Sequence, residues 1–190
     1  MRVIIAEDEA LIRMDLREML AEEGHEVVGE ARDGIEAVEL AGRLRPDVVF
    51  MDIDMPRLNG IDAAAAINDR RLAAVVMVTA FSQAALVEQA SRAGAMAFVV
   101  KPFARDDVVP AMQVAVSRYA EATALIEEVG DLSDRLEARK VVERAKGVLM
   151  TKGMSEAEAF HRLQKQAMDK RKTLREVAAA VILASEVAEP

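Results

Sequence analysis

Residues 48–60 read VVFMDIDMPRLNG, an apolar run that leads directly into the carboxylates Asp52 and Asp54. The run has the length and the Val and Phe content of a buried strand. A turn at Met55-Pro56 and a glycine, Gly60, follow it. The two acids either solvate the end of a strand or form a reactive site there, and the stretch alone leaves both interpretations open.

The composition indicates a cytoplasmic globular protein with one full domain and a smaller one. Of 190 residues, 52% are hydrophobic and 31% are charged, which is ordinary for a chain that forms a core. Aromatic residues make up only 3%, so the cores must consist of aliphatic residues and methionine. The chain has no cysteine, which fits a reducing compartment and excludes thiolate metal sites. No apolar run approaches the ~18 residues that span a bilayer, so we expect no membrane partner.

Five short runs rich in Val and Ile predict strands at residues 2–7, 25–31, 47–53, 73–80 and 97–101. Amphipathic segments lie between these runs. Apolar residues define the expected inner faces of the first two helices: Leu11, Met14, Leu16, Met19 and Leu20, then Ile35, Val38, Leu40 and Leu44. Strands that alternate with helices predict an α/β fold with a doubly wound, five-stranded parallel sheet.

The chain beyond residue 107 is predicted to be helical. A 4-3-4-3 spacing is typical of a short coiled coil and predicts dimerisation through this helix; packing on its own domain is the alternative. The residues with this spacing are Leu125, Val129, Leu132, Leu136 and Arg139.

Two capping boxes predict helix starts near the end of the chain, where Glu158 follows Ser155 and Glu176 follows Thr173. We therefore expect three final helices that start near Lys140, Ser155 and Thr173. The predicted organisation is a first domain at residues 1–120, a coiled-coil helix at 121–139 and a small all-α domain at 140–190.

Charge is unevenly distributed along the chain, whose net charge is −8. Residues 139–175 contain 11 basic and 4 acidic residues. A basic block in an acidic protein suggests a polyanionic partner. A solvated helical surface is the alternative interpretation.

Ligands of a doubly wound sheet bind at the carboxyl ends of its strands. The polar residues expected at that edge are Glu7, Asp8, Asp52, Thr79 and Lys101. Three close carboxylates repel one another by about 4 kcal/mol per pair at an effective dielectric near 20. Mg²⁺ offsets such repulsion, and Lys101 adds a positive charge. A carboxylate held in this way can attack phosphorus, with Thr79 hydrogen-bonded to a phosphoryl oxygen.

Together these residues, with Met55-Pro56 and Gly60 after Asp52 and with Lys101-Pro102, resemble the receiver domain of two-component response regulators over residues 1–120. The resemblance implies a flavodoxin-like sheet of order 2-1-3-4-5 and phosphorylation of Asp52 by a histidine kinase. It further implies that Asp8, Asp52 and the backbone carbonyl of Asp54 bind Mg²⁺ directly, with Glu7 acting through water. Lys101, after a cis bond to Pro102, would pair with the phosphoryl group, and Thr79 and Phe98 would form a switch pair.

The stretches RKVVERAKGVLM at 139–150 and MSEAEAFHRLQKQAMDKRKTLREVA at 154–178 resemble the ANTAR domain, an RNA-binding antitermination module. The resemblance covers residues 124–187 and implies paired RNA hairpins near a terminator as the target. The basic residues expected to contact RNA are Arg139, Lys140, Arg144, Lys146, Lys165, Arg171 and Lys172. We expect Phe160 to lie in the core and His161 to be a plain surface residue.

The predicted mechanism is a shift of population, in which phosphorylation controls dimerisation and RNA binding. The tail has no pair of nucleophile and base and no metal cluster, so we expect a regulator and not an enzyme. Two alternatives for the tail remain, a DNA-binding module and a protein-interaction or dimerisation module.

Overall fold

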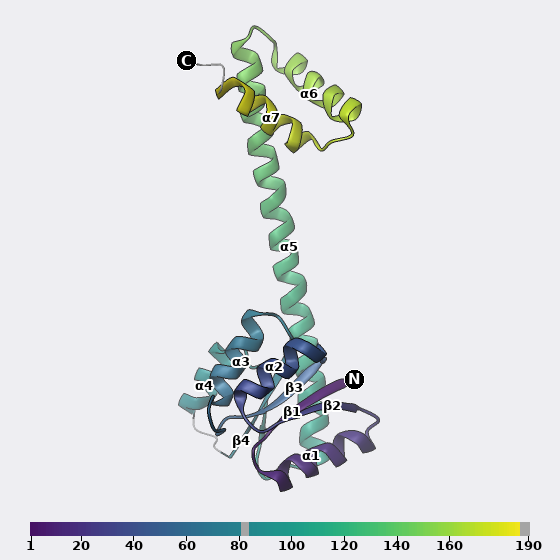
Figure 1. Cartoon of the computed structure of the whole chain (residues 1–190), viewed down its shortest axis with the longest axis vertical. Coiled ribbons are helices and arrows are strands. Elements are labelled where there is room, and N and C mark those ends of the chain that lie inside the picture. Colours follow the sequence, from purple (N-terminus) through teal and green to yellow (C-terminus); the bar gives the residue numbers. More distant parts are fainter. Residues whose placement is uncertain (81–83, 187–190) are drawn as a thin grey trace. The chain divides into compact units, whose positions relative to one another are not determined.

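The computed structural model describes residues 1–80 and 84–186, and the chain divides into two compact units at residues 1–124 and 125–190. Each unit is considered by itself (Figure 1). Among the described residues, no helix is both long enough and apolar enough to cross a bilayer.

Five parallel strands form the sheet of the first unit, in the order β2-β1-β3-β4-β5. They are β1 (Arg2–Ala6), β2 (Glu26–Ala31), β3 (Val48–Asp52), β4 (Ala74–Thr79) and β5 (Ala97–Val100). This arrangement confirms the doubly wound sheet and its order. Strands β3 and β4 are buried along their whole length, as expected for runs without polar alternation.

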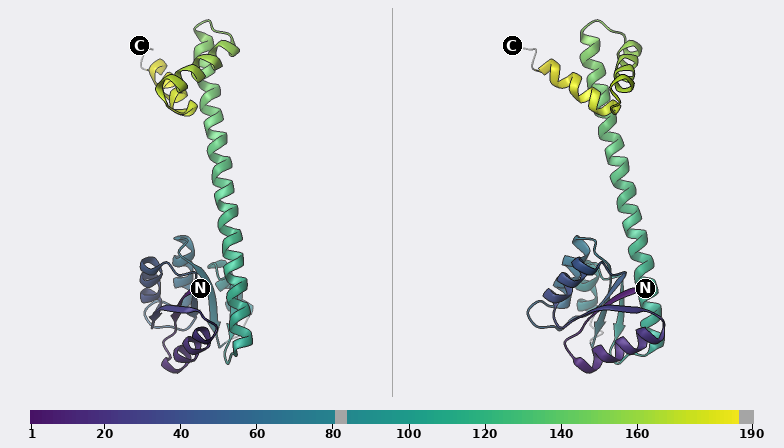
Figure 2. Two further views of the ribbon diagram at one scale, coloured as in Figure 1. Left: turned by 90° about the vertical axis from the view of Figure 1, so that its right-hand side faces the viewer. Right: turned by 45° about the vertical axis from the view of Figure 1, so that its right-hand side comes forward.

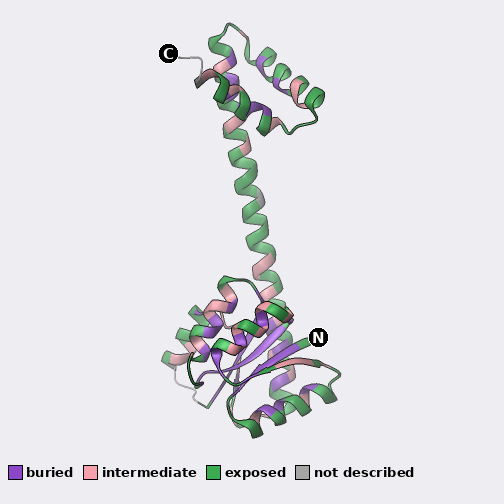
Figure 3. Cartoon of the chain, viewed as in Figure 1, coloured by how far each residue is buried: buried purple, intermediate pink, exposed green. Residues whose placement is uncertain are grey.

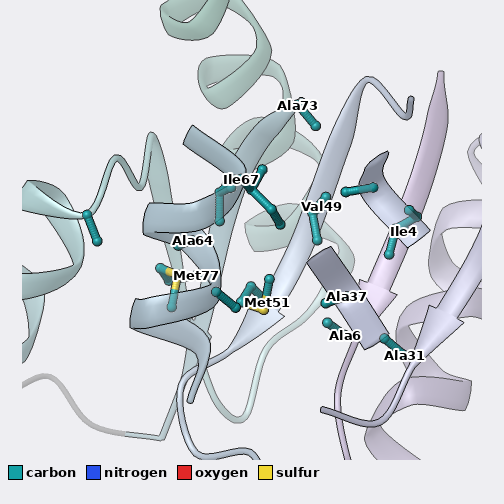
Figure 4. Packing of buried hydrophobic residues seen from close by; sticks show 14 of the residues in the cluster. Ile4, Ala6, Ala31, Ala37, Val49, Met51, Ala64, Ile67, Ala73 and Met77 are labelled. Carbon is teal, nitrogen blue, oxygen red and sulfur yellow. The ribbon is translucent and has the colours of Figure 1, made fainter. Parts of the chain in front are cut away.

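Helices cover both faces of this sheet (Figure 2). The helices of the chain are α1 (Ala10–Glu22), α2 (Gly34–Leu44), α3 (Gly60–Asp69), α4 (Ala84–Arg92), α5 (Arg105–Thr151), α6 (Glu156–Lys170) and α7 (Leu174–Glu186). A first core packs α2, α3 and α4 on one face, and a second core packs α1 and the start of α5 on the other. Figure 4 shows the first core, where Met51 and Met77 of the sheet lie beside the α3 residues Ala64 and Ile67. Aliphatic residues and methionine thus fill the space that aromatic residues would take.

The inner face of α1 differs from the expected one. Leu16 and Leu20 are buried as predicted, but Leu11 is 78% exposed and Met14 is 55% exposed. Arg13 occupies the inward position one turn before Leu16, because its guanidinium finds buried polar partners at the end of the sheet. The prediction of an uninterrupted apolar face was therefore wrong for the first turn of this helix.

Helix α5 runs without a break from Arg105 to Thr151, so the helix expected to start near Lys140 does not exist as a separate element. Nothing between residues 136 and 142 removes a backbone donor or caps a helix, and the helical hydrogen bonds continue. The expected coiled-coil segment and the first helix of the tail are two parts of one helix. Figure 3 shows that the part of α5 beyond the core of the first unit is mostly exposed.

The second unit has a small core of its own. The buried side chains come from the end of α5 (Val142, Ala145, Leu149), from α6 (Ala159, Leu163) and from α7 (Val177, Ala178, Ile182).

Both predicted capping boxes of the second unit are present. The Ser155 hydroxyl accepts from the Glu158 backbone and its own N–H donates to the Glu158 carboxylate; Thr173 and Glu176 make the same exchange. Phe160 is 38% exposed, which contradicts its expected core position. Ala159 and Leu163 are the α6 residues that pack in the core, and the Phe160 ring is left partly at the surface.

Candidate functional site

Three carboxylates meet at the carboxyl edge of the sheet. Glu7 and Asp8 directly follow β1, and Asp52 is the last residue of the neighbouring strand β3. One oxygen of each carboxylate lies within 4.8 Å of an oxygen of the other two. Glu7 and Asp52 are buried, whereas Asp8 is exposed. The cluster is therefore open to solvent on the side of Asp8.

The ammonium of Lys101 lies between two of these acids. Lys101 directly follows β5, and its backbone N–H donates to the carbonyl of Thr79 at the end of β4 (2.8 Å). Its Nζ lies 2.7 Å from Oε2 of Glu7 and 3.1 Å from Oδ1 of Asp52. Apart from this ion pair with Lys101, the buried Oε2 of Glu7 has no hydrogen-bond partner.

Burial dominates the electrostatics of the cluster. It raises the pKa of Glu7 and of Asp52, and although Lys101 acts in the opposite direction, it does not cancel the effect. Burial alone would lower the pKa of Lys101, but the interactions with Glu7 and Asp52 raise it instead. The ammonium thus stays charged, and one cation faces three acids.

A buried arginine that the sequence analysis missed supports the Glu7–Asp8 segment. Arg13 is 8% exposed, and its Nη1 donates to the carbonyl of Glu7 at 2.7 Å and to that of Asp8 at 3.4 Å. Its Nε lies 3.0 Å from Oε2 of Glu30. The one sequence signal was its spacing, three residues before Leu16 on the same helix face. Arg13 fixes the backbone from which two of the acids project.

The loop after Asp52 folds back onto the end of β3. The Gly60 N–H donates to the Ile53 carbonyl at 2.9 Å, and a Cβ at Gly60 would lie 1.8 Å from the Asp52 carbonyl oxygen. Only glycine fits at this approach. Arg57 of the same loop pairs with the buried Asp33, whose carboxylate caps the start of α2. The glycine of the stretch 48–60 is therefore required by its contact with the backbone of Asp52.

The remaining predicted receiver residues lie at or near the same edge. Thr79 ends β4 and is 2% exposed, and Phe98 is half-buried in β5 against the first core. The Lys101-Pro102 bond is cis, as predicted. The Asp54 side chain is exposed and is not one of the three clustered acids, so any metal contact there rests on its backbone carbonyl. The switch roles of Thr79 and Phe98 stay predictions.

Comparisons with known proteins identify the family. Residues 3–113 match the response regulator receiver domain, and residues 130–182 match the ANTAR domain. The chain is a response regulator. Over 182 residues it is 61% identical to the transcriptional regulatory protein PdtaR of Mycobacterium tuberculosis, which covers 95% of this chain and 89% of that protein.

Solved receiver domains share the fold of the first unit. The response regulator domain of Thermotoga maritima CheB is 35% identical with a TM-score of 0.58, covering 62% of this chain and 96% of that one. The receiver domain of a sensor histidine kinase from Pseudomonas aeruginosa is 28% identical with a TM-score of 0.56, covering 61% and 97%, and has a magnesium ion coordinated in its active site cleft. These findings confirm the predicted resemblance and fold, and they support a response regulator with an RNA-binding output domain.

The acidic cluster of this response regulator fits Mg²⁺. Its donors are carboxylate oxygens, the class of ligand that this hard cation prefers. Oε2 of Glu7 is buried with only the Lys101 ammonium beside it, and the pKa of both buried acids is raised. A divalent cation would supply the positive charge that Lys101 alone does not.

In the ANTAR unit, six of the seven basic residues expected to contact RNA have exposed side chains. They are Arg139, Lys140, Arg144, Lys165, Arg171 and Lys172. Two of these cations have acidic neighbours at the surface: Lys140 Nζ lies 2.8 Å from Glu137, and Lys172 Nζ lies 3.8 Å from Glu176. Exposed ion pairs of this kind are weak, so they leave both lysines able to exchange a carboxylate for a phosphate.

Lys146 differs from the other six. It is 8% exposed, and its Nζ lies 2.9 Å from a carboxylate oxygen of Glu143 and 2.7 Å from one of Glu156. Glu156 begins α6, so Lys146 joins the end of α5 to the start of α6. Its ammonium is already shared by two carboxylates, so a contact with RNA would have to displace one of them; the expected role of Lys146 as an RNA contact stays a prediction.

Proposed function

We propose that the chain is phosphorylated on Asp52 by a histidine kinase and that phosphorylation controls dimerisation and RNA binding in transcription antitermination. The observation that carries the proposal is the cluster at the sheet edge, where Asp52 lies with two other acids and 3.1 Å from Lys101. Positioned charge is what phosphoryl transfer requires of a protein.

The chemical step is transfer of a phosphoryl group to an Oδ atom of Asp52. The P–N bond of a kinase phosphohistidine breaks and an O–P bond forms, while the imidazole leaves with the electron pair and takes a proton from solvent. The carboxylate of Asp52 is the nucleophile, and the ammonium of Lys101 lies 3.1 Å from its Oδ1.

The surrounding residues stabilise the charge of the phosphoryl group. Asp8, Asp52, the Asp54 carbonyl and Glu7 would hold Mg²⁺, which supplies charge neutralisation for phosphoryl oxygens. Lys101 would exchange its carboxylate contacts for the phosphoryl group, and Thr79 at the neighbouring strand end would donate its hydroxyl. Movement of Thr79 and inward rotation of Phe98 would then change the receiver surface.

Dimerisation would use the apolar seam of α5, defined as Leu125, Val129, Leu132 and Leu136. These side chains are 55–61% exposed in the single chain, which is unusual for four apolar residues on one helical stripe. A second copy would bury them as the core of a parallel coiled coil. Two ANTAR domains would then present their basic faces to the two hairpins of one RNA.

The test combines phosphorylation with RNA selection. RNAs that bind would be selected from a pool of paired RNA hairpins with randomised loops, using protein treated with Mg²⁺ and acetyl phosphate. We expect Asp52→Asn to abolish acid-labile phosphate incorporation and the phosphodonor-dependent gain in RNA affinity, and Asp54→Asn to retain both. Phosphorylation should also raise the dimer fraction in sedimentation, and Leu132→Asp should prevent this while leaving Asp52 labelled.

Other outcomes would assign a different output. Undiminished labelling of Asp52→Asn would refute the phosphorylation site. Equal affinity for DNA hairpins at the same salt concentration would favour a DNA-binding output. Enrichment of neither nucleic acid would leave the tail as a protein-interaction or dimerisation module.

A further inference from the structure

Helix α5 contains two glycines for which the chain itself gives no reason. Gly130 and Gly147 are both exposed, have ordinary helical backbones, and a Cβ at either would meet no atom within 4 Å. Alanine would fit at both positions and would stabilise the helix, because glycine is a poor helix former. A close approach of something outside the chain is one reason to keep a glycine at such a place.

The surroundings of the two glycines differ. Gly147 lies on the side of α5 opposite the core residues Val142, Ala145 and Leu149, in a row with Lys140, Arg144 and Thr151 that follows helical 4-3-4 spacing. The row spans about 16 Å of the helix. By contrast, the neighbours of Gly130 one turn away are Ile126, Glu127, Ser133 and Asp134. Two of them are acidic and repel an anion, and the other two are uncharged.

One acid also borders Gly147, but its charge is already compensated. Glu143 lies four residues before Gly147, and its carboxylate is 2.9 Å from the buried ammonium of Lys146. Lys140 has an acidic neighbour too, Glu137 at 2.8 Å, but both side chains of that pair are exposed, so a phosphate can replace the carboxylate beside Lys140. A negatively charged partner is therefore favoured on this face.

A second copy of the helix is the weaker occupant. In a parallel pair of helices, equivalent positions face each other, so Lys140 would face Lys140 and Arg144 would face Arg144 of the second copy. Like charges opposed in this way destabilise a helix pair. The apolar seam that favours a second copy ends at Leu136, one turn before this row begins.

We propose that the row Lys140, Arg144, Gly147 and Thr151 is where the RNA sugar–phosphate backbone docks on the ANTAR domain, with Gly147 as the point of closest approach. This inference rests on the proposed RNA-binding function. Because Gly147 has no side chain, the RNA strand can lie against the helix backbone at this position. Lys140 and Arg144, which precede Gly147 on the helix, bind phosphates, and the hydroxyl of Thr151 lies one turn after Gly147. Glycine offers no group that reads a base, so the contact positions RNA without selecting its sequence.

The experiment compares Gly147→Ala with Gly130→Ala in the full-length chain, using the RNA recovered by the hairpin selection and a version with scrambled loops. Each substitution should raise the melting temperature by about 3 °C, because each replaces glycine in an exposed helix. Gly147→Ala should nevertheless weaken binding to both RNAs by about tenfold, with their ratio unchanged, whereas Gly130→Ala should bind as the wild type does. Gly147→Leu should weaken binding further in proportion to its size.

Three results would overturn the proposal. Equal RNA affinity of both alanine variants would show that no close approach occurs at Gly147, although the RNA-binding function would stand. A loss of dimer in sedimentation, with RNA affinity retained, would assign the glycine to a second copy of the helix. If the wild-type chain enriches no RNA, the proposed function itself fails, and this surface fails with it.

Discussion

Two lysines of this chain each lie between two carboxylates, one in each compact unit. Lys101 of the receiver contacts Glu7 and Asp52, whose side chains are 1% and 7% exposed. Lys146 of the ANTAR domain contacts Glu143 and Glu156, whose side chains are 55% and 68% exposed. The lysine side chains themselves are almost equally buried, at 12% and 10%.

The burial of the acids separates the two sites. In the receiver, burial raises the pKa of Glu7 and Asp52 despite the ammonium between them. In the ANTAR domain, the hydrogen bond from Lys146 lowers the pKa of Glu156, because solvent already stabilises that carboxylate. One ammonium and two carboxylates therefore have different roles in the two units. In the receiver they form a site that a metal ion or a phosphoryl group would stabilise, and in the ANTAR domain they link two helices.

Lys101→Met should have the largest effect. It leaves Glu7 and Asp52 buried without a cation, which we expect to cost about 3 kcal/mol of receiver stability in the absence of Mg²⁺. Phosphate incorporation should also fall by at least about a hundredfold, because the phosphoryl group loses its ammonium. Chemical denaturation and labelling with acetyl phosphate would measure the two effects, and unchanged labelling would contradict the role of Lys101.

The two sites should respond to pH in opposite directions. A raised carboxylate pKa contributes stability that is present below the unfolded value and is lost as pH rises through the folded value, which applies to Asp52. A lowered pKa contributes stability that is present above the unfolded value and is lost as pH falls through the folded value, which applies to Glu156. In metal-free buffer, the free energy of unfolding of Asp52→Asn should therefore increase relative to that of the wild type as pH rises. Glu156→Gln should be less stable than the wild type at neutral pH, and this difference should disappear as pH falls.

Hydrogen exchange would resolve these pH effects by region. The strand amides of the receiver report on Asp52, and the core of the ANTAR domain reports on Glu156. If the difference in stability between Asp52→Asn and the wild type were independent of pH between about 4 and 8, the proposed difference in pH response between the two sites would be refuted.

Lys146→Met should have the smallest effect. The exposed carboxylates of Glu143 and Glu156 are solvated by water when the ammonium is removed, and the methionine retains most of the packing of the lysine stem. We expect a small decrease in the melting temperature of the ANTAR domain and little change in RNA affinity. A loss of RNA affinity as large as that of Arg144→Gln would restore Lys146 to the RNA-binding surface.

Much of the receiver site could be predicted because its parts follow local rules. Apolar runs predicted five strands, of which β3 and β4 are buried along their whole length, and the topology of parallel sheets then placed Glu7, Asp8, Asp52, Thr79 and Lys101 at one edge. Arg13 could not be predicted in this way. Its partners are backbone carbonyls of Glu7 and Asp8, and no residue type marks a carbonyl that will need a donor.

The helical part was harder to predict because a helix surface is ambiguous in sequence. Lys146 and Arg144 belong to the same basic segment, yet one faces Glu156 of another helix and the other faces outward. Phe160 lies between two buried residues, Ala159 and Leu163, yet its own side chain is 38% exposed. Burial in a three-helix unit depends on how the helices pack, which helical spacing alone does not specify.

The sequence by itself determined the strands, the edge at which the acids and Lys101 meet, the capped starts of α6 and α7, and the resemblance to a receiver followed by an ANTAR domain. These follow from short-range preferences and from one topological rule. Only the tertiary structure decided that α5 is a single helix to Thr151, that Lys146 is enclosed, and that Gly147 lies open beside two cations. The physical reason is burial, since the same charge acts as a link, a contact or a reactive group according to the protein and water around it.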